Sequence, residues 1–164
     1  MHPAALDDAT LLDDCDETRT RRSGPGGQHR NKVETAVVLR HRPTGITAEA
    51  SERRSQVENR AVAVQRLRLR LALEHRETAG DGPSSLWRSR AADGRLAIAI
   101  GHHDYPTLVA EALDHLQATG FRTAAAAAAL GVTTTQLIGL FRRSAPAWTA
   151  LTSARATAGL PRLA

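Results

Sequence analysis

The strongest constraint on the fold is a pattern of two short strands followed directly by a long helix. Residues 36–42 are rich in apolar and β-branched side chains and read as a strand, and residues 46–51 read as a returning strand. Between them, Pro43-Thr44-Gly45 has the composition of a tight turn. This stretch therefore predicts a β-hairpin.

The hairpin leads into a helix that begins near Ser55. Ser55 and Glu58 have the spacing of a capping box, in which each side chain satisfies an amide at the start of a helix. Apolar residues then recur every three or four positions, the period of a helix, at Val57, Ala61, Val64, Leu67 or Arg68, and Leu71. We expect this stripe to pack on the hairpin and the arginines beside it to face outward, namely Arg60, Arg66, Arg70 and Arg76.

Composition divides the rest of the chain into three parts. Residues 1–16 form an acidic segment with a turn or a short helix, and residues 77–104, rich in Gly, Pro and Ser, read as a linker. Helical spacing of apolar residues predicts four helices over residues 105–164. The expected domains are therefore residues 1–16, 17–76, 77–104 and 105–164.

Two of the predicted C-terminal helices form a recognisable pair. An Ala-rich helix over residues 123–130, a Leu-Gly-Val turn and a helix that opens with Thr and Gln resemble a helix-turn-helix unit. Such units place their second helix in a nucleic-acid groove. A small helical packing module explains the same pattern, and the sequence leaves both interpretations open.

Charge is distributed very unevenly along the chain. Residues 1–17 carry six acids and no Lys or Arg, whereas residues 18–76 carry fourteen basic residues against five acids. A basic middle segment favours a polyanionic partner, because each neutralised phosphate releases condensed counterions. An arginine-rich helix with a solvated face accounts for the same excess, so charge alone does not decide between them.

Cysteine usage and hydropathy indicate the compartment. Cys15 is the only cysteine, so the chain has no internal disulfide and suits a reducing environment. The first residues lack the basic-then-apolar pattern of a secretion signal. Apolar runs are far shorter than the roughly 20 residues that a membrane span needs. We expect a cytoplasmic protein without a membrane span.

Histidines do not predict a metal site. His102-His103-Asp104 offers suitable ligand types, but the single cysteine and the lack of a second ligand cluster argue against a bound metal. We expect His41, His75 and His115 on the surface or in loops. No metal and no cofactor are predicted.

A glycine-rich segment, residues 22–32, lies between a weak strand signal at residues 17–22 and the hairpin. Three glycines within four positions allow backbone conformations that other residues disfavour and permit close approach to a ligand. Pro25 restricts the backbone between them, and the surrounding basic residues suit phosphate. Neither a P-loop ending nor a Rossmann glycine spacing is present. On its own, the segment also fits an ordinary glycine turn beside a basic patch.

In its sequence context, this segment resembles the catalytic domain of class I peptide chain release factors. The resemblance starts with Arg-Ser-Gly-Pro-Gly-Gly-Gln-His-Arg-Asn-Lys at residues 22–32 and continues through Ala36-Val37. It then runs through His-Arg-Pro-Thr-Gly-Ile at residues 41–46, Glu-Arg-Arg-Ser-Gln at residues 52–56, and Asn59. Four blocks in this order, over residues 17–76 without a gap, are far more specific than Gly-Gly-Gln alone.

The resemblance implies both a fold and a reaction. The fold is α+β, with a small sheet that contains the hairpin and is backed by the long helix, followed by a small all-α, helix-turn-helix-like domain. The reaction is hydrolysis of the peptidyl-tRNA ester in the ribosomal peptidyl transferase centre. Gly26, Gly27 and Gln28 are the implied catalytic residues. The Gln28 main-chain amide would stabilise the reacting centre, and its side chain would admit water and exclude larger nucleophiles.

The resemblance also implies partners. Ribosomal RNA of the large subunit and peptidyl-tRNA are the expected ligands, and a glutamine methyltransferase acting on Gln28 is a candidate partner, because family members are often methylated there. We expect a monomer. The residues expected to contact RNA are Arg22, Ser23, Gly24, Pro25, His29, Arg30, Lys32, Arg53 and Arg54.

The role of the chain follows from what accompanies the catalytic segment. Full-length release factors carry further domains that read stop codons, whereas about 16 residues precede this segment here. We therefore expect a codon-independent hydrolase in ribosome rescue, with residues 105–164 recognising the stalled particle through RNA or a protein. The alternative is a non-catalytic RNA- or DNA-binding regulator built on a release-factor-like domain.

Overall fold

The computed structural model describes residues 1–20 and 35–163. The chain divides into two compact units, Pro3–His75 and Arg76–Ala164. The first unit combines a sheet with helices, and the second consists mainly of helices. This composition confirms the predicted α+β class with a helical C-terminal region.

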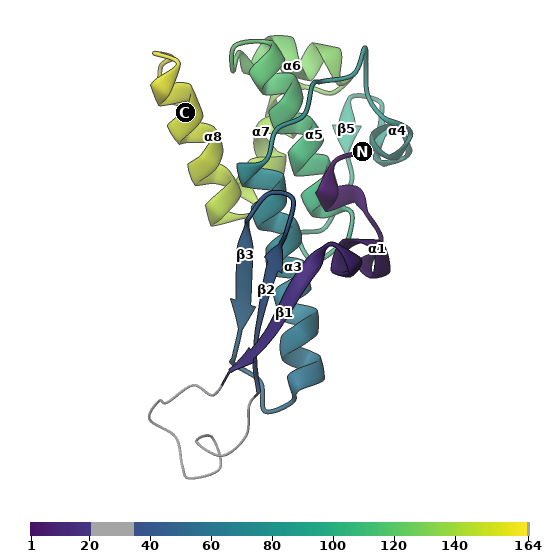
Figure 1. Cartoon of the computed structure of the whole chain (residues 1–164). Helices are drawn as coiled ribbons and strands as arrows, with labels where there is room; N and C mark the ends of the chain where they lie inside the picture. The colour runs from purple at the N-terminus through teal and green to yellow at the C-terminus, as the bar shows by residue number, and fades with distance from the viewer. Residues whose placement is uncertain (21–34, 164) are drawn as a thin grey trace. The chain divides into compact units, whose positions relative to one another are not determined.

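The first unit is built on a three-stranded antiparallel sheet in the order β1-β2-β3 (Figure 1). The strands are β1 (Cys15–Thr20), β2 (Ala36–His41) and β3 (Thr47–Ala50). The predicted hairpin is thus confirmed as β2 and β3. Gly45 closes its turn with a φ of +71°, a left-handed conformation that favours glycine over residues with a side chain.

One long helix, α3 (Gln56–Glu74), packs along β2 and β3 (Figure 1). It begins as predicted, because the Ser55 hydroxyl caps it by accepting a hydrogen bond from the Glu58 amide at 3.4 Å. The core between helix and sheet consists of fully buried apolar side chains, among them Val37 and Leu39 from β2 and Leu67 and Leu71 from α3.

The buried face of α3 differs from the predicted stripe at its first turns. Val64, Leu67 and Leu71 are buried as expected, but Val57 is 78% exposed and Ala61 is also exposed. In their place the helix buries the polar residue Asn59. An apolar pattern misses such a residue, because only its distant hydrogen-bond partners make its burial favourable.

The acidic N-terminal segment is part of the first unit. It forms a 3-10 turn, η1 (Pro3–Ala5), and a short helix, α1 (Asp8–Asp13), and η1 contacts α3. Arg68 of α3 is 8% exposed and donates to the Asp8 carboxylate at 2.7 and 3.2 Å and to the Ala4 carbonyl at 2.9 Å. This buried guanidinium therefore joins the N-terminal segment to the long helix.

His41, at the end of β2, is 2% exposed, so its predicted surface position is wrong. Its Nδ1 lies 2.8 Å from the Thr44 hydroxyl, a contact within the hairpin turn. Burial lowers the pKa of His41 below its ordinary value, because desolvation disfavours the charged imidazolium.

The lowered pKa of His41 predicts an acid-sensitive first unit. The unfolded chain protonates His41 near pH 6.5, whereas the folded chain does so only at lower pH, so the unfolded state binds more protons as the pH falls. The free energy of unfolding should therefore fall below about pH 6.5. His41→Gln should remove this part of the pH dependence, measured by hydrogen exchange of the β2 amides. An unchanged slope in the variant would assign it to other groups.

The second unit contains the four predicted C-terminal helices. These are α5 (Tyr105–Ala118), α6 (Thr123–Ala129), α7 (Thr134–Arg142) and α8 (Ala145–Thr157). Left-handed glycines follow three of them, with φ of +60° at Gly120, +67° at Gly131 and +70° at Gly159. The sequence located these helix ends because glycine is the residue that adopts this conformation at low cost.

Residues 77–104, predicted to be a linker, belong to the packed second unit. They contain helix α4 (Ser85–Arg90) and a two-stranded ladder of β4 (Ala91–Ala92) and β5 (Arg95–Leu96). Trp87 in α4 is fully buried, and its indole N–H donates to the Leu130 carbonyl at 2.9 Å. That partner lies 43 residues away, so the local composition gave no sign of it.

Two further predictions about polar residues are corrected in this unit. Arg76 was expected to face outward, but its side chain is 20% exposed and contacts Asp114 at 3.2 Å. His115 was expected on the surface or in a loop and is 5% exposed.

The length and hydropathy of the helices bear on membrane insertion. Across residues 1–20 and 35–163, no helix combines the length and the apolar character that a bilayer crossing requires.

Candidate functional site

Ten of the predicted site residues lie in residues 21–34, outside the described part of the chain. The structure describes the ends of the two strands on either side of this segment, β1 and β2, and we call these strand ends the frame of the segment. Thr20 at the end of β1 pairs with Ala36 at the start of β2. The segment therefore departs from and returns to one end of the sheet. The ten residues are Arg22, Ser23, Gly24, Pro25, Gly26, Gly27, Gln28, His29, Arg30 and Lys32.

The other two predicted RNA-contacting residues, Arg53 and Arg54, lie in the connection between β3 and α3. Both are exposed. The main chain of Arg53 is fixed on both sides by Asn59, whose Oδ1 accepts from the Arg53 amide at 2.9 Å and whose Nδ2 donates to the Arg53 carbonyl at 3.0 Å. The two guanidinium groups thus project from a loop with a fixed backbone.

Asn59 also connects this loop to the return of the glycine-rich segment. Its Nδ2 donates to the Thr35 carbonyl at 2.7 Å, and Thr35 directly precedes β2. A single fully buried amide therefore holds both the Arg53 loop and the residue that follows residues 21–34. The resemblance to release factors includes Asn59, but Asn59 was not among the predicted site residues. It lies off the predicted apolar stripe, so helical periodicity carried no signal for its burial.

An ionic cluster lies on β1 and α3 beside this end of the sheet. Arg60 Nε contacts Glu17 Oε2 at 2.7 Å, and Arg19 contacts the other carboxylate oxygen at 3.3 Å. The hydrogen bond from Arg60 lowers the pKa of Glu17, with a smaller contribution from Arg19, so the carboxylate stays charged. Two arginines share one acid here, which leaves this part of the surface net positive.

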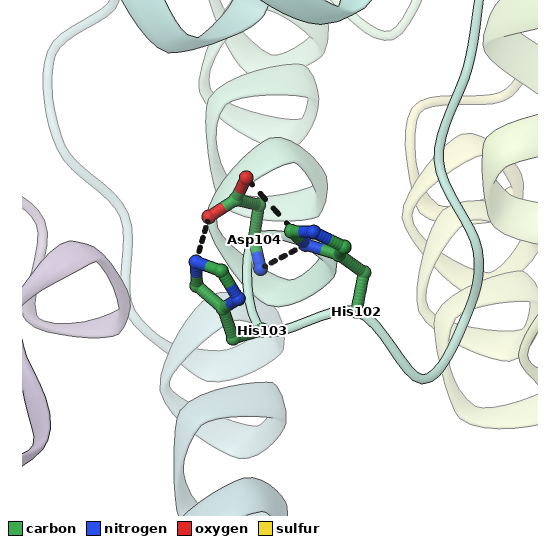
Figure 2. Close-up of side chains that lie close together, drawn as sticks. All are labelled: His102, His103 and Asp104. Carbon is green, nitrogen blue, oxygen red and sulfur yellow. Dashed lines mark hydrogen bonds and ion pairs between the residues drawn. The ribbon is translucent and has the colours of Figure 1, made fainter.

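The remaining candidate cluster, His102-His103-Asp104, lies in the second unit. Figure 2 shows both imidazole rings turned toward Asp104. His103 Nε2 lies 2.8 Å from Asp104 Oδ1, and Arg90 contacts Asp104 Oδ2 at 2.6 Å. Both carboxylate oxygens thus have protein partners, and this ion-pair network accounts for the cluster. The absence of a metal site stays a prediction.

Comparison with known proteins identifies the first unit. The model of the RF-1 domain family matches residues 11–94. The chain is 42% identical over 86 residues to peptide chain release factor 1 of Acidiphilium cryptum (strain JF-5), and 41% identical over 86 residues to that of Malacoplasma penetrans (strain HF-2). Each alignment covers 52% of this chain and 24% of the relative.

A third relative gives the same result. Peptide chain release factor 1 of Granulibacter bethesdensis (strain ATCC BAA-1260 / CGDNIH1) is 43% identical over 81 residues, which is 49% of this chain and 21% of that protein. The chain thus spans about a quarter or less of the length of these relatives. The family match covers 84 of 164 residues, from residue 11 to residue 94, and it includes the glycine-rich segment together with the sheet and α3. The chain therefore belongs to the RF-1 domain family.

Proposed function

We propose that this chain hydrolyses the ester bond of peptidyl-tRNA on the ribosome, as a release-factor-like hydrolase. The observation that carries the proposal is the family match across the whole segment from Arg22 to Lys32, with Gly26-Gly27-Gln28 intact. The described frame agrees with a presented loop, because the segment starts and ends at paired residues of one sheet end. The relatives are named peptide chain release factors.

The proposed chemistry needs few protein groups. Water attacks the ester carbonyl, negative charge develops on the carbonyl oxygen, and the ribose oxygen of the tRNA leaves with a proton. A main-chain N–H aimed at the developing charge stabilises this transition state without a titrating side chain. We assign that N–H to Gln28 and its orientation to Gly26 and Gly27, which lack the Cβ that restricts the backbone. The Gln28 side chain admits water and excludes larger nucleophiles.

We assign affinity for the ribosome to the predicted RNA-contacting residues in and beside the glycine-rich segment, most of which are basic. Of these, Arg53 and Arg54 are exposed on a backbone that Asn59 fixes. Contacts from arginine to phosphate position a protein on nucleic acid and weaken with salt. The remaining assigned contacts are Arg22, Ser23, Gly24, Pro25, His29, Arg30 and Lys32.

Charge reversal of these two arginines gives a direct prediction. The double variant Arg53→Glu, Arg54→Glu should raise the chain concentration needed for half-maximal peptide release by about tenfold or more, with little change in the rate at saturation. The reason is that phosphate contacts supply binding and not the chemical step. The measurement is peptide release from stalled ribosomes over a range of chain concentrations.

The control for this variant is Arg40→Glu, which reverses an exposed arginine on β2 of the first unit. It should leave the half-maximal concentration nearly unchanged. If Arg40→Glu weakened release as much per charge as the double variant, overall charge rather than the Arg53 loop would set the affinity.

We further propose that hydrolysis is independent of a codon and serves ribosome rescue in the cytoplasm, with the second unit recognising the stalled particle. The test compares peptide release on ribosomes that carry a stop codon, a sense codon or a truncated mRNA in the decoding site. Rescue predicts efficient release with truncated mRNA and no requirement for a stop codon. Release that depends strictly on a stop codon would contradict the rescue role while leaving the hydrolase activity in place.

A non-catalytic RNA- or DNA-binding regulator is the second candidate function. The α6–α7 pair of the second unit favours it, because two helices joined by a tight turn are typical of nucleic-acid-binding proteins. The same release experiment separates the two functions. A regulator would bind nucleic acid and release no peptide from any of the three complexes.

A further inference from the structure

Helix α8, the last helix in Figure 1, ends in a turn that brings the following residues back to it. Gly159 has a φ of +70°, and its amide donates to the Ala156 carbonyl at 3.0 Å. The Leu160 amide donates to the Arg155 carbonyl at 2.9 Å, so the two bonds and the left-handed glycine form a Schellman motif. Beyond this motif, the Pro161 carbonyl accepts a hydrogen bond from the Arg155 guanidinium at 3.0 Å. The segment after α8 is therefore held against the helix.

A pocket with a volume of about 390 Å³ lies between α8 and residues 160–163, which we call the returning segment. Trp148 and Ala156 line the pocket from α8, and Leu160 and Leu163 line it from the returning segment. The two α8 residues are eight positions apart, so they lie on the same face of the helix. The volume lies toward the lower end of the range for small-ligand sites. The pocket thus has an apolar lining on both sides and room for a small group.

One wall of the pocket contains a buried guanidinium without a negative partner. Arg155 lines the pocket, is 7% exposed, and donates from its two terminal nitrogens to neutral carbonyls, those of Phe121 at 2.6 Å and Pro161 at 3.0 Å. Its Nε is buried and has no hydrogen-bond partner within residues 1–20 and 35–163, and Arg155 forms no ion pair there. Burial of an unpaired charge is unfavourable, so buried cations normally have an anionic partner. The charge of Arg155 therefore favours an anion in the adjacent pocket.

The rest of the pocket adds positive charge and no acid. Arg162 is exposed and lines the pocket from the returning segment. None of the described residues that line the pocket is Asp or Glu, and the sequence after Asp114 contains neither. Two cations without an acid beside them produce a positive potential, which concentrates negatively charged ligands. The pocket therefore combines an apolar lining with the charge that an anion requires.

These two properties fit a carboxylate that is attached to an aliphatic group. A guanidinium binds a carboxylate through strong, charge-assisted hydrogen bonds, and an aliphatic group gains free energy when an apolar lining removes it from water. A nucleotide fits less well, because bases bind by stacking on aromatic rings. Trp148 is the one aromatic residue among the described residues of the lining, and the Arg142 guanidinium already lies over its ring, 5.1 Å from the centroid. The remaining apolar lining is aliphatic.

We propose that the pocket binds the carboxyl terminus of a partner protein whose last residue is aliphatic. The terminal carboxylate pairs with Arg155 and Arg162. The aliphatic side chain lies against Trp148, Leu160 and Leu163. A chain end fits a small pocket because the polypeptide does not have to continue through it, and because the carboxylate and the side chain are attached to the same carbon. The inference goes beyond the proposed function and does not rest on it, since it gives the second unit a protein partner whichever reaction the first unit performs.

The probe is N-acetyl-leucine, which carries both groups and is titrated into the full isotope-labelled chain while NMR spectra are recorded. We expect the signals of the Trp148 indole N–H and the Arg155 Nε–H to move together, with a Kd of about 1–10 mM for so small a ligand. The primary amide, N-acetyl-leucinamide, has the same shape without the charge and should bind about tenfold more weakly. Trp87, whose indole N–H donates to the Leu130 carbonyl, lies outside the lining, so its signal should stay in place and shows that the unit is folded.

Variants of α8 and the returning segment test where the ligand binds. Ala156 is an exposed residue of the lining, so Ala156→Leu should narrow the pocket without disturbing the core and weaken binding by about tenfold. The matched control is Ala145→Leu, the same substitution at an exposed residue of α8 outside the lining, which should keep the affinity within about twofold. Arg162→Gln should weaken binding about two- to fivefold, the usual contribution of an exposed charge pair. Arg155 stays unchanged because its bonds to two main-chain carbonyls support the fold.

Several outcomes would overturn the inference. Equal affinities for N-acetyl-leucine and its amide would show that the pocket does not recognise a carboxylate. Wild-type binding by Ala156→Leu would place the ligand elsewhere on the chain. A short peptide with an internal aspartate beside a leucine and an amidated end should bind more weakly than N-acetyl-leucine, and equal or tighter binding would assign the pocket to acidic segments within a chain. Tighter binding of adenosine monophosphate would assign the pocket to nucleic acid.

Discussion

Replacing Gly27 by alanine is expected to lower the rate of peptide release from stalled ribosomes by about 10²–10³-fold, the usual effect of losing one oxyanion-stabilising donor. A Cβ at position 27 restricts the backbone that aims the Gln28 amide, so the N–H no longer points at the developing charge. Gly26→Ala should act in the same direction. The measurement is the single-turnover rate of peptide release at saturating chain.

The matched comparison is Gln28→Ala, which keeps the main-chain N–H and removes only the side chain. We expect a loss of about tenfold, smaller than for either glycine, together with easier attack by nucleophiles larger than water. A Gly27→Ala variant that released peptide at the wild-type rate would contradict the assignment of the amide. A Gln28→Ala loss larger than that of Gly27→Ala would move the chemistry to the side chain.

Asn59→Ala is expected to destabilise the first unit by about 3 kcal/mol, since three hydrogen bonds of about 1 kcal/mol each are lost. The amide is fully buried and bonds to Thr35 and to both main-chain groups of Arg53. After truncation, these main-chain groups lose their protein partner. Peptide release should also fall, because the return of the glycine-rich segment and the Arg53 loop are no longer held together.

The stability loss expected for Asn59→Ala has to be measured with a probe that reports on the first unit alone. Every tryptophan, tyrosine and phenylalanine of the chain lies beyond residue 75, so aromatic signals report on the second unit. Hydrogen exchange of peptides from β2 and β3 in increasing urea reports on the first. Val57→Ala, which truncates a 78% exposed residue of the same helix, is the control and should change stability by less than about 0.5 kcal/mol. A comparably small loss for Asn59→Ala would mean that Asn59 is not the connection between the two loops.

Local signals in the sequence located most elements of the fold. The Ser55 cap, the Gly45 turn and the glycines after α5, α6 and α8 all lie where the sequence predicted, because capping and left-handed turns depend on residues close in the chain. Periodicity identified Val64, Leu67 and Leu71 as core for the same reason.

Features that depend on distant partners were missed. Asn59 is buried by bonds to residues 35 and 53, and Arg68 by bonds to residues 4 and 8. Trp87 makes a supposed linker part of a packed unit through a carbonyl 43 residues later. Composition and periodicity carry no information on such contacts, because a polar or isolated residue becomes favourable inside only when its partner arrives.

The candidate site also has parts that local sequence signals predicted and parts that only the structure revealed. The proposed catalytic segment was found through its motif, and the predicted strands on either side of it, residues 17–22 and 36–42, overlap β1 and β2. Asn59, which connects the Arg53 loop to the return of this segment, required the structure.

The central claim is that the main-chain N–H of Gln28 reaches the ester in the large ribosomal subunit. Its most direct test is a cryo-EM structure of the full chain on a ribosome stalled on truncated mRNA, with uncleaved peptidyl-tRNA held by the Gly27→Ala variant or by a non-hydrolysable linkage. With the non-hydrolysable linkage, we expect residues 26–28 beside the tRNA 3′ end, with the Gln28 nitrogen about 3 Å from the oxygen on which charge develops. Finding residues 26–28 packed against α3 of the same chain, or bound away from the peptidyl transferase centre, would contradict the account.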